Sequence, residues 1–507
     1  MKNKLDKKII FEILATILIA IFCISLTPRT LQNDTFYTIK IGEHILQTGK
    51  IDMQEPFAWH DQLEYTYPHW LYDLMLYLVY SLGGMTGIYI STCLFAIILG
   101  ITLYKVNSKI AKNQVLSFII TIVAMYMLRD YIAARAQLVT FILFTLQIFC
   151  IERLVDTSQK KYGISLIIIS ILIANLHVAV WPFMFVLYLP YIAEYIMAIL
   201  EERIAKKYGK ERKQGEKILI SKRNGTKLLI ITMLICIVTG FLTPLGTTPY
   251  TYLVKTMQGN TTQNINEHQP LVLINNTDMM CVLIVLLAIL AFTNSKIKVS
   301  DLIMLGGLIF LMFYSKRQAT ILILIGSVIF NKLIFEWIKK WEQSIDEKLV
   351  KITVNRFGIF LVSASVIMLS LYFIKPRVEA QYIDESVYPV EMSNFIIEYF
   401  NNDFTDVRIY NEYNYGSYLL YRGIPVFIDS RADLYAPEFN VGVDVFSDFI
   451  DSLNLSIYFE DIFEKYDITH VILYKNSKIN MIIENANLSN YKLLKSDDNF
   501  VFYKIET

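Results

Sequence analysis

The sequence predicts a polytopic α-helical membrane protein with about 11 transmembrane helices and a small C-terminal extracytoplasmic α/β domain. Of its 507 residues, 54% are hydrophobic and only 18% are charged, and the mean hydropathy is +0.43. Charge is divided unevenly, because residues 375–507 hold 11 Lys and Arg against 22 Asp and Glu, whereas residues 1–374 hold 36 against 24. This asymmetry predicts a membrane domain over 1–374 and a water-facing domain over 375–507, and it argues against a nucleic-acid partner.

The predicted spans are apolar runs of about 15–22 residues, the length that a helix needs to cross a bilayer. They lie near residues 9–27, 86–106, 114–128, 137–154, 162–176, 178–200, 228–243, 279–294, 301–314, 318–334 and 356–374. The first run follows four lysines and lacks a small-residue cleavage site, so we expect an uncleaved anchor with a cytoplasmic N-terminus. Alternation then gives 28 Lys and Arg in cytoplasmic segments against 8 in outer loops, as the positive-inside rule requires.

The first outer loop, residues 28–85, is the largest extracytoplasmic feature of the predicted membrane domain. Within it, "HWLYDLMLYLVYSLGG" (69–84) is apolar but short, and its Trp and Tyr side chains suit the headgroup level. We therefore expect an interfacial or re-entrant helix there. The predicted crossings place the C-terminal domain on the same outer face. The five cysteines lie inside apolar runs and none has C-x-x-C spacing, so we expect neither disulfides nor a zinc site.

The C-terminal domain has the alternation of strand-like and helical runs that is typical of a small α/β fold. Runs rich in Val, Ile, Tyr and Phe predict strands at 406–410, 425–429, 469–474 and 500–505. Helical patterns lie near 388–400, 442–465 and 478–487, and residues 411–424 are long enough for a helical crossover. Asn411 and the turn at Asp429 and Arg431 then fall at the carboxyl ends of neighbouring strands, where open α/β sheets bind ligands.

Asp34 is the candidate catalytic residue, because it leads a mixed segment directly after the first span. One interpretation is a plain helix N-cap, for which Asn33 or Asp34 would serve. The other is a functional carboxylate at the membrane boundary, where an unused charge is costly. Asp34 could cap the following helix and also act in catalysis, so the two roles are compatible.

Other polar side chains fall on the predicted outer face and are candidate substrate-binding residues. Each also has a structural interpretation, since cations at helix ends extend toward water and a single histidine commonly bonds to backbone. Asp429 and Arg431 could equally form a solvated ion-pair loop. The full candidate set is His69, Arg135, Asn175, His177, Glu267, Arg317, Asn411, Asp429 and Arg431.

A carboxylate and cations at a lipid–water boundary suit a sugar donor whose polyprenyl tail lies in the bilayer and whose phosphate lies at headgroup depth. The carboxylate can accept the proton of an attacking hydroxyl. Arginine can hold two oxygens of the departing phosphate. No P-loop and no dinucleotide-binding glycine pattern is present in the sequence, so soluble nucleotide chemistry has no support.

The sequence also resembles a known group of membrane enzymes, over most of the chain. The similarity is carried by "NDTFYTIKIGEHILQTGKIDMQEPFAW", "YPHWLYDLMLYLVYSLGGMTG", "ARAQLVTFIL", "NLHVAVW", "TPLGTTPY", "INEHQP" and "GSYLLYRGIPVFIDSRADLY". These stretches look like those of bacterial membrane proteins that are similar to GT-C glycosyltransferases. That superfamily contains the protein O-mannosyltransferases, aminoarabinose transferases and oligosaccharyltransferases.

The resemblance implies a GT-C-like fold in which the acid after the first span is a catalytic base or a metal-site carboxylate, a role that maps onto Asp34. It differs from the usual pattern where Ala136 follows Arg135 in place of proline, and where His268 stands in place of tryptophan. Asp34 is followed by Thr35 and not by a second acid. The cofactor is therefore unassigned, with a divalent cation left open.

We accordingly expect an inverting glycosyltransferase of the cell envelope, located in the cell membrane. Its partners would be a polyprenyl-phosphate lipid donor, an extracytoplasmic glycan or protein acceptor, and the lipid bilayer. A polymerase or ligase of undecaprenyl-linked glycans is the first alternative, in which catalysis depends on Arg and His. A non-enzymatic transporter or scaffold of envelope assembly is the second. A transporter should have ionisable residues in mid-span or paired Gly/Pro-broken helices, and because few mid-span charges are present this alternative ranks lower.

Overall fold

The computed structural model describes residues 6–61, 63–208, 217–259 and 261–506. Some of the lysines and arginines that the topology counts as cytoplasmic lie outside these ranges, namely Lys2, Lys4, Lys210, Arg212 and Lys213. The chain forms two compact units, and each combines segments distant in sequence. The first unit comprises residues 1–28, 89–249 and 266–378, and the second comprises 29–88, 250–265 and 379–507. The domain boundary expected at 374/375 remains a prediction.

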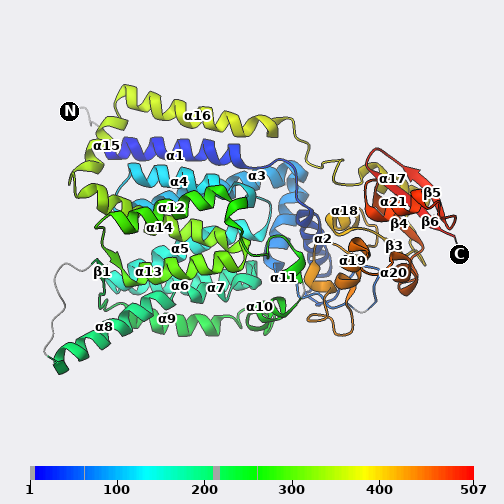
Figure 1. The fold of residues 1–507 in the computed structure, drawn as a ribbon, viewed down its shortest axis with the longest axis horizontal. Coiled ribbons are helices and arrows are strands. Elements are labelled where there is room, and N and C mark those ends of the chain that lie inside the picture. Colours follow the sequence, from blue (N-terminus) through cyan, green and yellow to red (C-terminus); the bar gives the residue numbers. More distant parts are fainter. Residues whose placement is uncertain (1–5, 62, 209–216, 260, 507) are drawn as a thin grey trace. The chain divides into compact units, whose positions relative to one another are not determined.

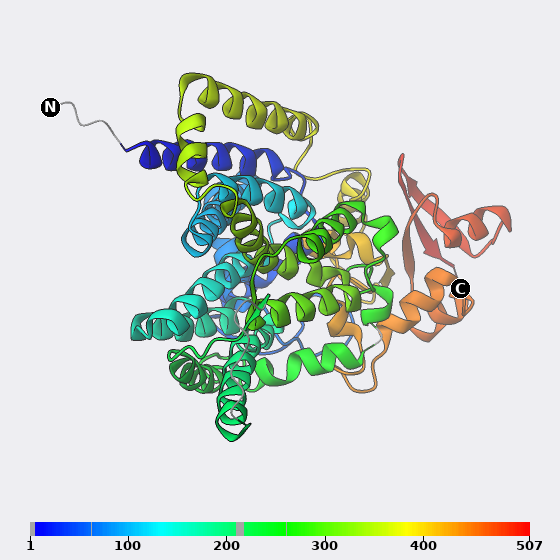
Figure 2. The same cartoon turned by 60° about the vertical axis from the view of Figure 1, so that its left-hand side comes forward.

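The first unit is a helical bundle whose main helices run side by side (Figures 1 and 2). Its helices are α1 (Lys7–Leu26), the second part of α3 (Trp70–Ala111), α4 (Val115–Met127), α5 (Ala136–Thr157), α6 (Lys160–Leu176), α7 (Phe183–Val186), α8 (Leu189–Tyr208), α9 (Thr226–Thr239), α12 (Thr277–Phe292), α13 (Val299–Tyr314), α14 (Ala319–Lys339), α15 (Ile345–Thr353) and α16 (Arg356–Val378). Short 3-10 turns connect several of them: η1 (Arg129–Tyr131), η2 (Val178–Val180), η3 (Leu273–Asn275) and η4 (Lys316–Gln318). Two short strands, β1 (Ile218–Leu219) and β2 (Ile297–Lys298), pair in parallel.

Among the described residues, six helical segments are long and apolar enough to cross a membrane. They are Lys7–Leu26, Trp70–Ala111, Ala136–Thr157, Val178–Tyr208, Lys316–Lys339 and Arg356–Val378. Every apolar run that the sequence singles out overlaps a helix of this unit. The prediction of a mostly helical membrane protein is confirmed at this level. The count of about 11 crossings and the orientation of the termini stay predictions.

A network of paired charges holds several helices of the first unit together. Arg223, just before α9, donates through Nη2 to Glu194 Oε2 of α8 at 2.6 Å and through Nη1 to Glu152 Oε2 of α5 at 3.3 Å. Lys332 of α14 donates to Glu152 Oε1 at 3.1 Å and to Asp301 Oδ1 of α13 at 2.7 Å. Because each buried carboxylate has a cation beside it, the network fixes the packing of these helices without leaving a buried charge unpaired.

The helix α3 is broken at Gly84, whose φ of 57° and ψ of −149° are not helical. This positive φ is one that glycine adopts at little cost. Residues 70–83 therefore form a separate helix, as the sequence predicts for 69–84. It packs closely on α2 (Asn33–Thr48), because a Cβ at Gly42 would lie 2.1 Å from the Asp73 carbonyl oxygen. The interfacial position of this segment stays a prediction.

The second unit contains a four-stranded sheet of order β3-β4-β6-β5. Its strands are β3 (Ile409–Tyr410), β4 (His470–Tyr474), β5 (Tyr491–Ser496) and β6 (Phe500–Ile505). The pair β3 and β4 is parallel, whereas β4 with β6 and β5 with β6 are antiparallel. Its helices are α2, the first part of α3, α10 (Thr248–Gln258, which begins at the unit boundary), α11 (Thr261–Asn264), α17 (Val390–Tyr399), α18 (Tyr413–Tyr421), η5 (Ala432–Tyr435), α19 (Val445–Asn454), α20 (Phe459–Lys465) and α21 (Lys478–Asn485). Helices α17 and α21 pack against the sheet (Figure 1).

The structure corrects three local expectations in the C-terminal segment. Residues 425–429 are not a strand, although Val426 makes one isolated parallel bridge to Ala58. The strand Tyr491–Ser496 is missing from the expected set, because two lysines and a serine interrupt its apolar residues and no β-branched residue is present. The helical pattern over 442–465 belongs to two helices, α19 and α20, separated by a turn at Leu455 with φ of 60°.

Aromatic side chains join α2 to the C-terminal segment inside the second unit. The ring of Phe36, which is fully buried, lies 5.0 Å from that of Tyr388, 5.2 Å from that of Tyr418 and 5.4 Å from that of Tyr421. Large rings in such a cluster bury much apolar area and prefer these tilted arrangements. Helix α2 and the C-terminal segment thus share one hydrophobic core.

Candidate functional site

Asp34 lies in the first turn of α2, on a helix that is otherwise well buried. The cap position is Gln32, whose side chain makes no capping hydrogen bond, so the interpretation of Asn33 or Asp34 as the N-cap is wrong. Asn33 instead donates through Nδ2 to the Tyr413 carbonyl at 2.9 Å. Asp34 is partly exposed, while Thr35 and Phe36 beside it are fully buried. A rigid, packed helix therefore presents this carboxylate at its N-terminal end.

Asp73 is a second carboxylate of the second unit, and sequence reasoning missed it. It is fully buried in the first part of α3, where the Thr38 side chain of α2 lies near its carboxylate. The signal available was a single acid inside the apolar stretch 70–80. His69, a candidate residue, lies one residue before this helix, is partly exposed, and accepts a hydrogen bond at its carbonyl from Asp73 N at 2.9 Å.

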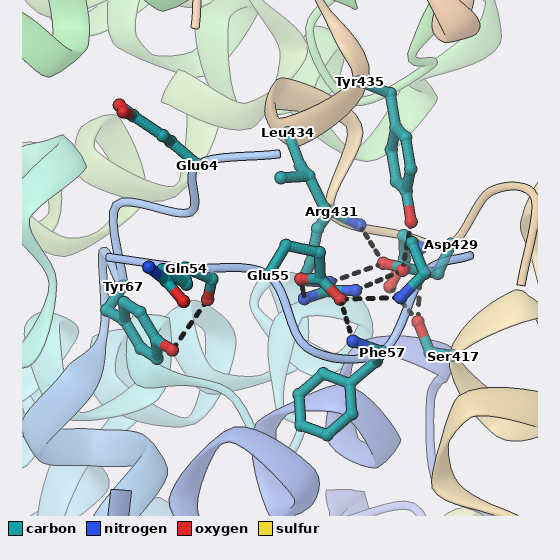
Figure 3. A network of polar contacts seen from close by, with 12 residues as sticks. Gln54, Glu55, Phe57, Glu64, Tyr67, Ser417, Asp429, Arg431, Leu434 and Tyr435 are labelled. Carbon is teal, nitrogen blue, oxygen red and sulfur yellow. Dashed lines mark hydrogen bonds and ion pairs between the residues drawn. The ribbon is translucent and has the colours of Figure 1, made fainter. Parts of the chain in front are cut away.

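Arg431, Asp429 and Glu55 form a buried ionic network in the second unit (Figure 3). Arg431 donates through Nε to Asp429 Oδ1 at 2.8 Å and through Nη2 to Asp429 Oδ2 at 2.6 Å. Its Nη1 pairs with Glu55 Oε2. Tyr435 donates to Asp429 Oδ2 at 2.6 Å, and Glu55 Oε1 accepts from Phe57 N at 2.6 Å. The acids and the base therefore satisfy one another and the neighbouring backbone.

Burial and charge together set the ionisation of this network. Burial raises the pKa of the Asp429 carboxyl, but the Arg431 guanidinium and its hydrogen bonds outweigh burial and hold that pKa below its usual range. Asp429 is 0% exposed and Arg431 is 5% exposed, so the interpretation of a solvated ion-pair loop is wrong. Nothing in the sequence near Glu55 indicates its partner, because the two residues are 376 positions apart.

The side-chain amide of Asn411 hydrogen-bonds the backbone of residues 425–429, as a neighbouring strand would. Its Oδ1 accepts from Phe427 N at 2.8 Å and its Nδ2 donates to Ile428 O at 2.7 Å. A side-chain amide that satisfies backbone groups in this way replaces a neighbouring strand. The structure thus places Asn411 beside the segment that leads to Asp429, although through side-chain contacts and not through adjacent strand ends.

In the first unit, the structure brings together Arg135, Glu267 and Arg317. Arg135, which precedes α5, donates through Nη1 to Glu267 Oε1 at 3.3 Å. The loop that carries Glu267 is tied to η4, since Arg317 N donates to the Glu267 carbonyl at 2.9 Å and Lys316 N donates to the Gln269 carbonyl at 2.8 Å. Arg135 therefore pairs with the Glu267 carboxylate, and the backbone at Arg317 is bonded to the backbone of the same residue.

The electrostatics of this cluster are dominated by its cations. Burial raises the pKa of the Glu267 carboxyl, yet Arg135 and Arg317 outweigh burial and lower it. Burial and the charge of Arg317 lower the pKa of His268 to about 4, so this imidazole is neutral at pH 7. Burial, with Glu267 nearby, raises the pKa of Tyr131 to about 12. The cluster holds two guanidinium groups against one carboxylate, a net positive charge suited to an anionic ligand.

Asn175 and His177 lie at the C-terminal end of α6 and make structural contacts within the first unit. Asn175 Nδ2 donates to the Ile171 carbonyl at 2.8 Å and to the Leu242 carbonyl at 3.0 Å. His177, 2% exposed, shares a 3.0 Å hydrogen bond between its Nδ1 and Thr140 Oγ1 of α5. These contacts fix the turn after α6 against α5 and the loop after α9.

Across the residues with described positions, no three His, Cys, Asp or Glu side chains form a group that could hold a metal ion. The chemistry that the side chains themselves offer is a partly exposed carboxylate on α2 and, in the first unit, a cationic cluster around Glu267. A carboxylate can accept a proton and guanidinium groups can bind phosphate oxygens.

No family model matches the sequence, and no curated protein sequence matches it. Among solved structures, the fold is similar to that of an oligosaccharyltransferase from Archaeoglobus fulgidus, determined tethered with an acceptor peptide containing the NVT sequon via a disulfide bond. The sequences are 11% identical, the TM-score is 0.58, and the match covers 98% of this chain and 74% of that chain. This similarity extends over both compact units and shows the fold.

Proposed function

We propose that this chain is a glycosyltransferase of the cell membrane. It moves a sugar from a polyprenyl-phosphate-linked donor to an extracytoplasmic glycan or protein acceptor of the cell envelope. The observation that carries the proposal is the fold similarity to an archaeal oligosaccharyltransferase over 98% of the chain. The carboxylate of Asp34 and the cationic cluster around Glu267 supply side chains that fit this chemistry.

In the proposed reaction, Asp34 is the base. It accepts the proton of the acceptor hydroxyl while that oxygen forms a bond to the anomeric carbon. The bond from this carbon to the phosphate oxygen breaks, and its electron pair leaves on the phosphate. A single displacement of this kind inverts the configuration at the anomeric carbon. Arg135 and Arg317 bind the departing phosphate, whose growing negative charge their guanidinium groups stabilise.

The other candidate residues have supporting parts in this proposal. His69 contributes to substrate binding from the segment before α3. Asn175 and His177 position the turn after α6, and Asn411 with the Asp429–Arg431 pair positions the loop that follows residues 425–429. We assign Asn175, His177, Asn411, Asp429 and Arg431 a positioning role because their side chains hydrogen-bond to protein atoms.

The test is sugar transfer by the full chain in lipid vesicles, with a panel of undecaprenyl-phosphate-linked sugars as donors. We expect Asp34→Asn to lower the rate by about 10²–10⁴-fold, the contribution of a general base. Asp61→Asn is the matched control, because Asp61 is an exposed acid of the same loop, and it should keep the rate. Arg135→Gln and Arg317→Gln should raise the KM for the donor.

Full activity of the Asp34→Asn variant would contradict the proposed base. In that case the polymerase or ligase alternative, in which Arg and His carry catalysis, gains support. Release of polyprenyl phosphate measured in step with the glycosylated product distinguishes transfer from simple donor hydrolysis.

A further inference from the structure

One end of the helical bundle in the first unit holds an open cavity of about 710 Å³ that the proposed function does not use. Its walls come from the start of α1, the end of α3, the start of α13, the end of α14 and the segment that begins α15. All lining residues belong to the first unit. None of the candidate residues for glycosyl transfer lines it.

Lysines outnumber acids among the residues that line the cavity. Six lysines line it: Lys8, Lys112, Lys296, Lys298, Lys332 and Lys339. Lys8 pairs with Glu347 at 3.3 Å, and Lys332 pairs with Glu152 and Asp301. For the other four lysines, no ammonium group has a hydrogen bond or ion pair with a residue that the structure describes. Lys112, Lys296 and Lys339 are exposed, and Lys298 is partly exposed and lies near Glu152 and Asp301, so the four ammonium groups are accessible to a ligand from water.

The acids that line the cavity are engaged with the protein. Asp301 accepts from Lys332, and Asp346 accepts from Gln114 N at 2.8 Å. Glu336 accepts from Lys296 N at 2.8 Å, and Glu347 accepts from Lys8. Glu336 and Asp346 bond to backbone N–H groups and keep their negative charge, so the six lysines and four acids give the lining a net charge of +2.

The cavity also has an apolar side, formed by Ile110, Leu219, Leu333 and Phe335. Its segments, which include residues 105–113, 295–300 and 331–356, are the ones expected on the cytoplasmic side of the membrane. A basic pocket among membrane helices at that level is the usual setting for binding acidic lipid head groups. Ammonium groups on flexible stems bind phosphate as point charges.

From these observations we propose that the cavity binds a phosphate-bearing anion, through Lys112, Lys296, Lys298 and Lys339. The phosphate group can belong to an anionic lipid whose chains lie along the apolar side, or to a soluble phosphate compound. Both ligands use the same four cations. The site is separate from the glycosyl-transfer site and its loss leaves Asp34 and the cluster around Glu267 in place.

The experiment compares the wild-type full chain with a variant in which these four lysines are changed to glutamine. The matched control changes Lys160, Lys161, Lys206 and Lys207 to glutamine, since these lysines belong to α6 and α8 and do not line the cavity. A third variant changes the four cavity lysines to arginine, which keeps the charge. Each protein is reconstituted into phosphatidylcholine nanodiscs that contain or lack phosphatidylglycerol. Native mass spectrometry then measures how much phosphatidylglycerol stays bound to the protein. A thermal shift measures binding of inorganic pyrophosphate.

We expect the glutamine variant to bind at least about tenfold more weakly than the control, as the loss of four phosphate-facing charges predicts. The arginine variant should keep most of the binding. Retention of phosphatidylglycerol alone assigns the site to a lipid, and a pyrophosphate shift alone assigns it to a soluble phosphate. Equal binding by the cavity and control variants, or no binding of either probe by the wild type, would overturn the proposal. If the fourfold variant does not fold, Lys112→Gln and Lys298→Gln must each weaken binding.

Discussion

Replacing Arg431 by methionine should destabilise the second unit strongly. The guanidinium is 5% exposed and binds Asp429 at 2.8 Å and 2.6 Å as well as Glu55. Methionine has a similar length but no charge, so both carboxylates would remain buried without their cation. Breaking a buried pair in this way costs about 3–5 kcal/mol. The triple change Arg431→Met, Asp429→Asn, Glu55→Gln removes all three charges and should recover part of that loss.

Thermal unfolding of the purified chain, followed with a thiol-independent fluorescence probe, measures this difference. The matched control is Arg408→Met, because Arg408 pairs with Asp467 at a surface position with 42% and 82% exposed side chains. An exposed pair of this kind contributes at most about 1 kcal/mol. An Arg431→Met variant as stable as the Arg408→Met control would refute the structural interpretation. Loss of transfer activity with unchanged stability would instead favour direct substrate binding by Arg431.

Two further perturbations test the second unit. Burial raises the pKa of the Glu412 carboxyl from 4.5 to about 7, so the folded state binds its proton more tightly than the unfolded state; stability should therefore fall by about 3 kcal/mol as pH rises from 4.5 through 7. Glu412→Gln should flatten that part of the stability–pH curve measured by thermal unfolding, and an unchanged slope would show that another group titrates. Gly416→Ala should cost about 1–3 kcal/mol, because the added Cβ would lie 2.0 Å from the Ile428 carbonyl oxygen. Gly83→Ala, where nothing lies within 4 Å of the added Cβ, is its control, and equal midpoints of thermal unfolding for the two variants would contradict the clash.

The sequence alone predicted the apolar helices of the first unit, although not the short polar helix α15, because the length and apolar character of a run are local properties that the bilayer or a helix core selects directly. It also predicted the strands His470–Tyr474 and Phe500–Ile505, whose β-branched and aromatic residues favour a buried pleated surface. Arg135, Glu267 and Arg317 were separate candidates on the predicted outer face, and only the structure brings them together.

Only the tertiary structure decided how residues 425–429 and 491–496 are built. Residues 425–429 have strand composition, but the Asn411 amide takes the Phe427 and Ile428 backbone groups, so no ladder forms. Residues 491–496 contain no β-branched residue, yet β6 provides the hydrogen-bonding partner. Backbone pairing depends on which segment lies alongside, and a single run of sequence does not contain that information.

The ion pairs of Arg431 show most clearly what the sequence determines and what only the tertiary structure decides. The sequence places Asp429 and Arg431 two residues apart and leaves open whether water or protein surrounds them. Folding buries both and brings Glu55 to the same guanidinium from 376 positions away. The strength and the role of an ion pair follow from its solvent exposure and its partners, and these are set by the packing of distant segments and not by the local order of residues.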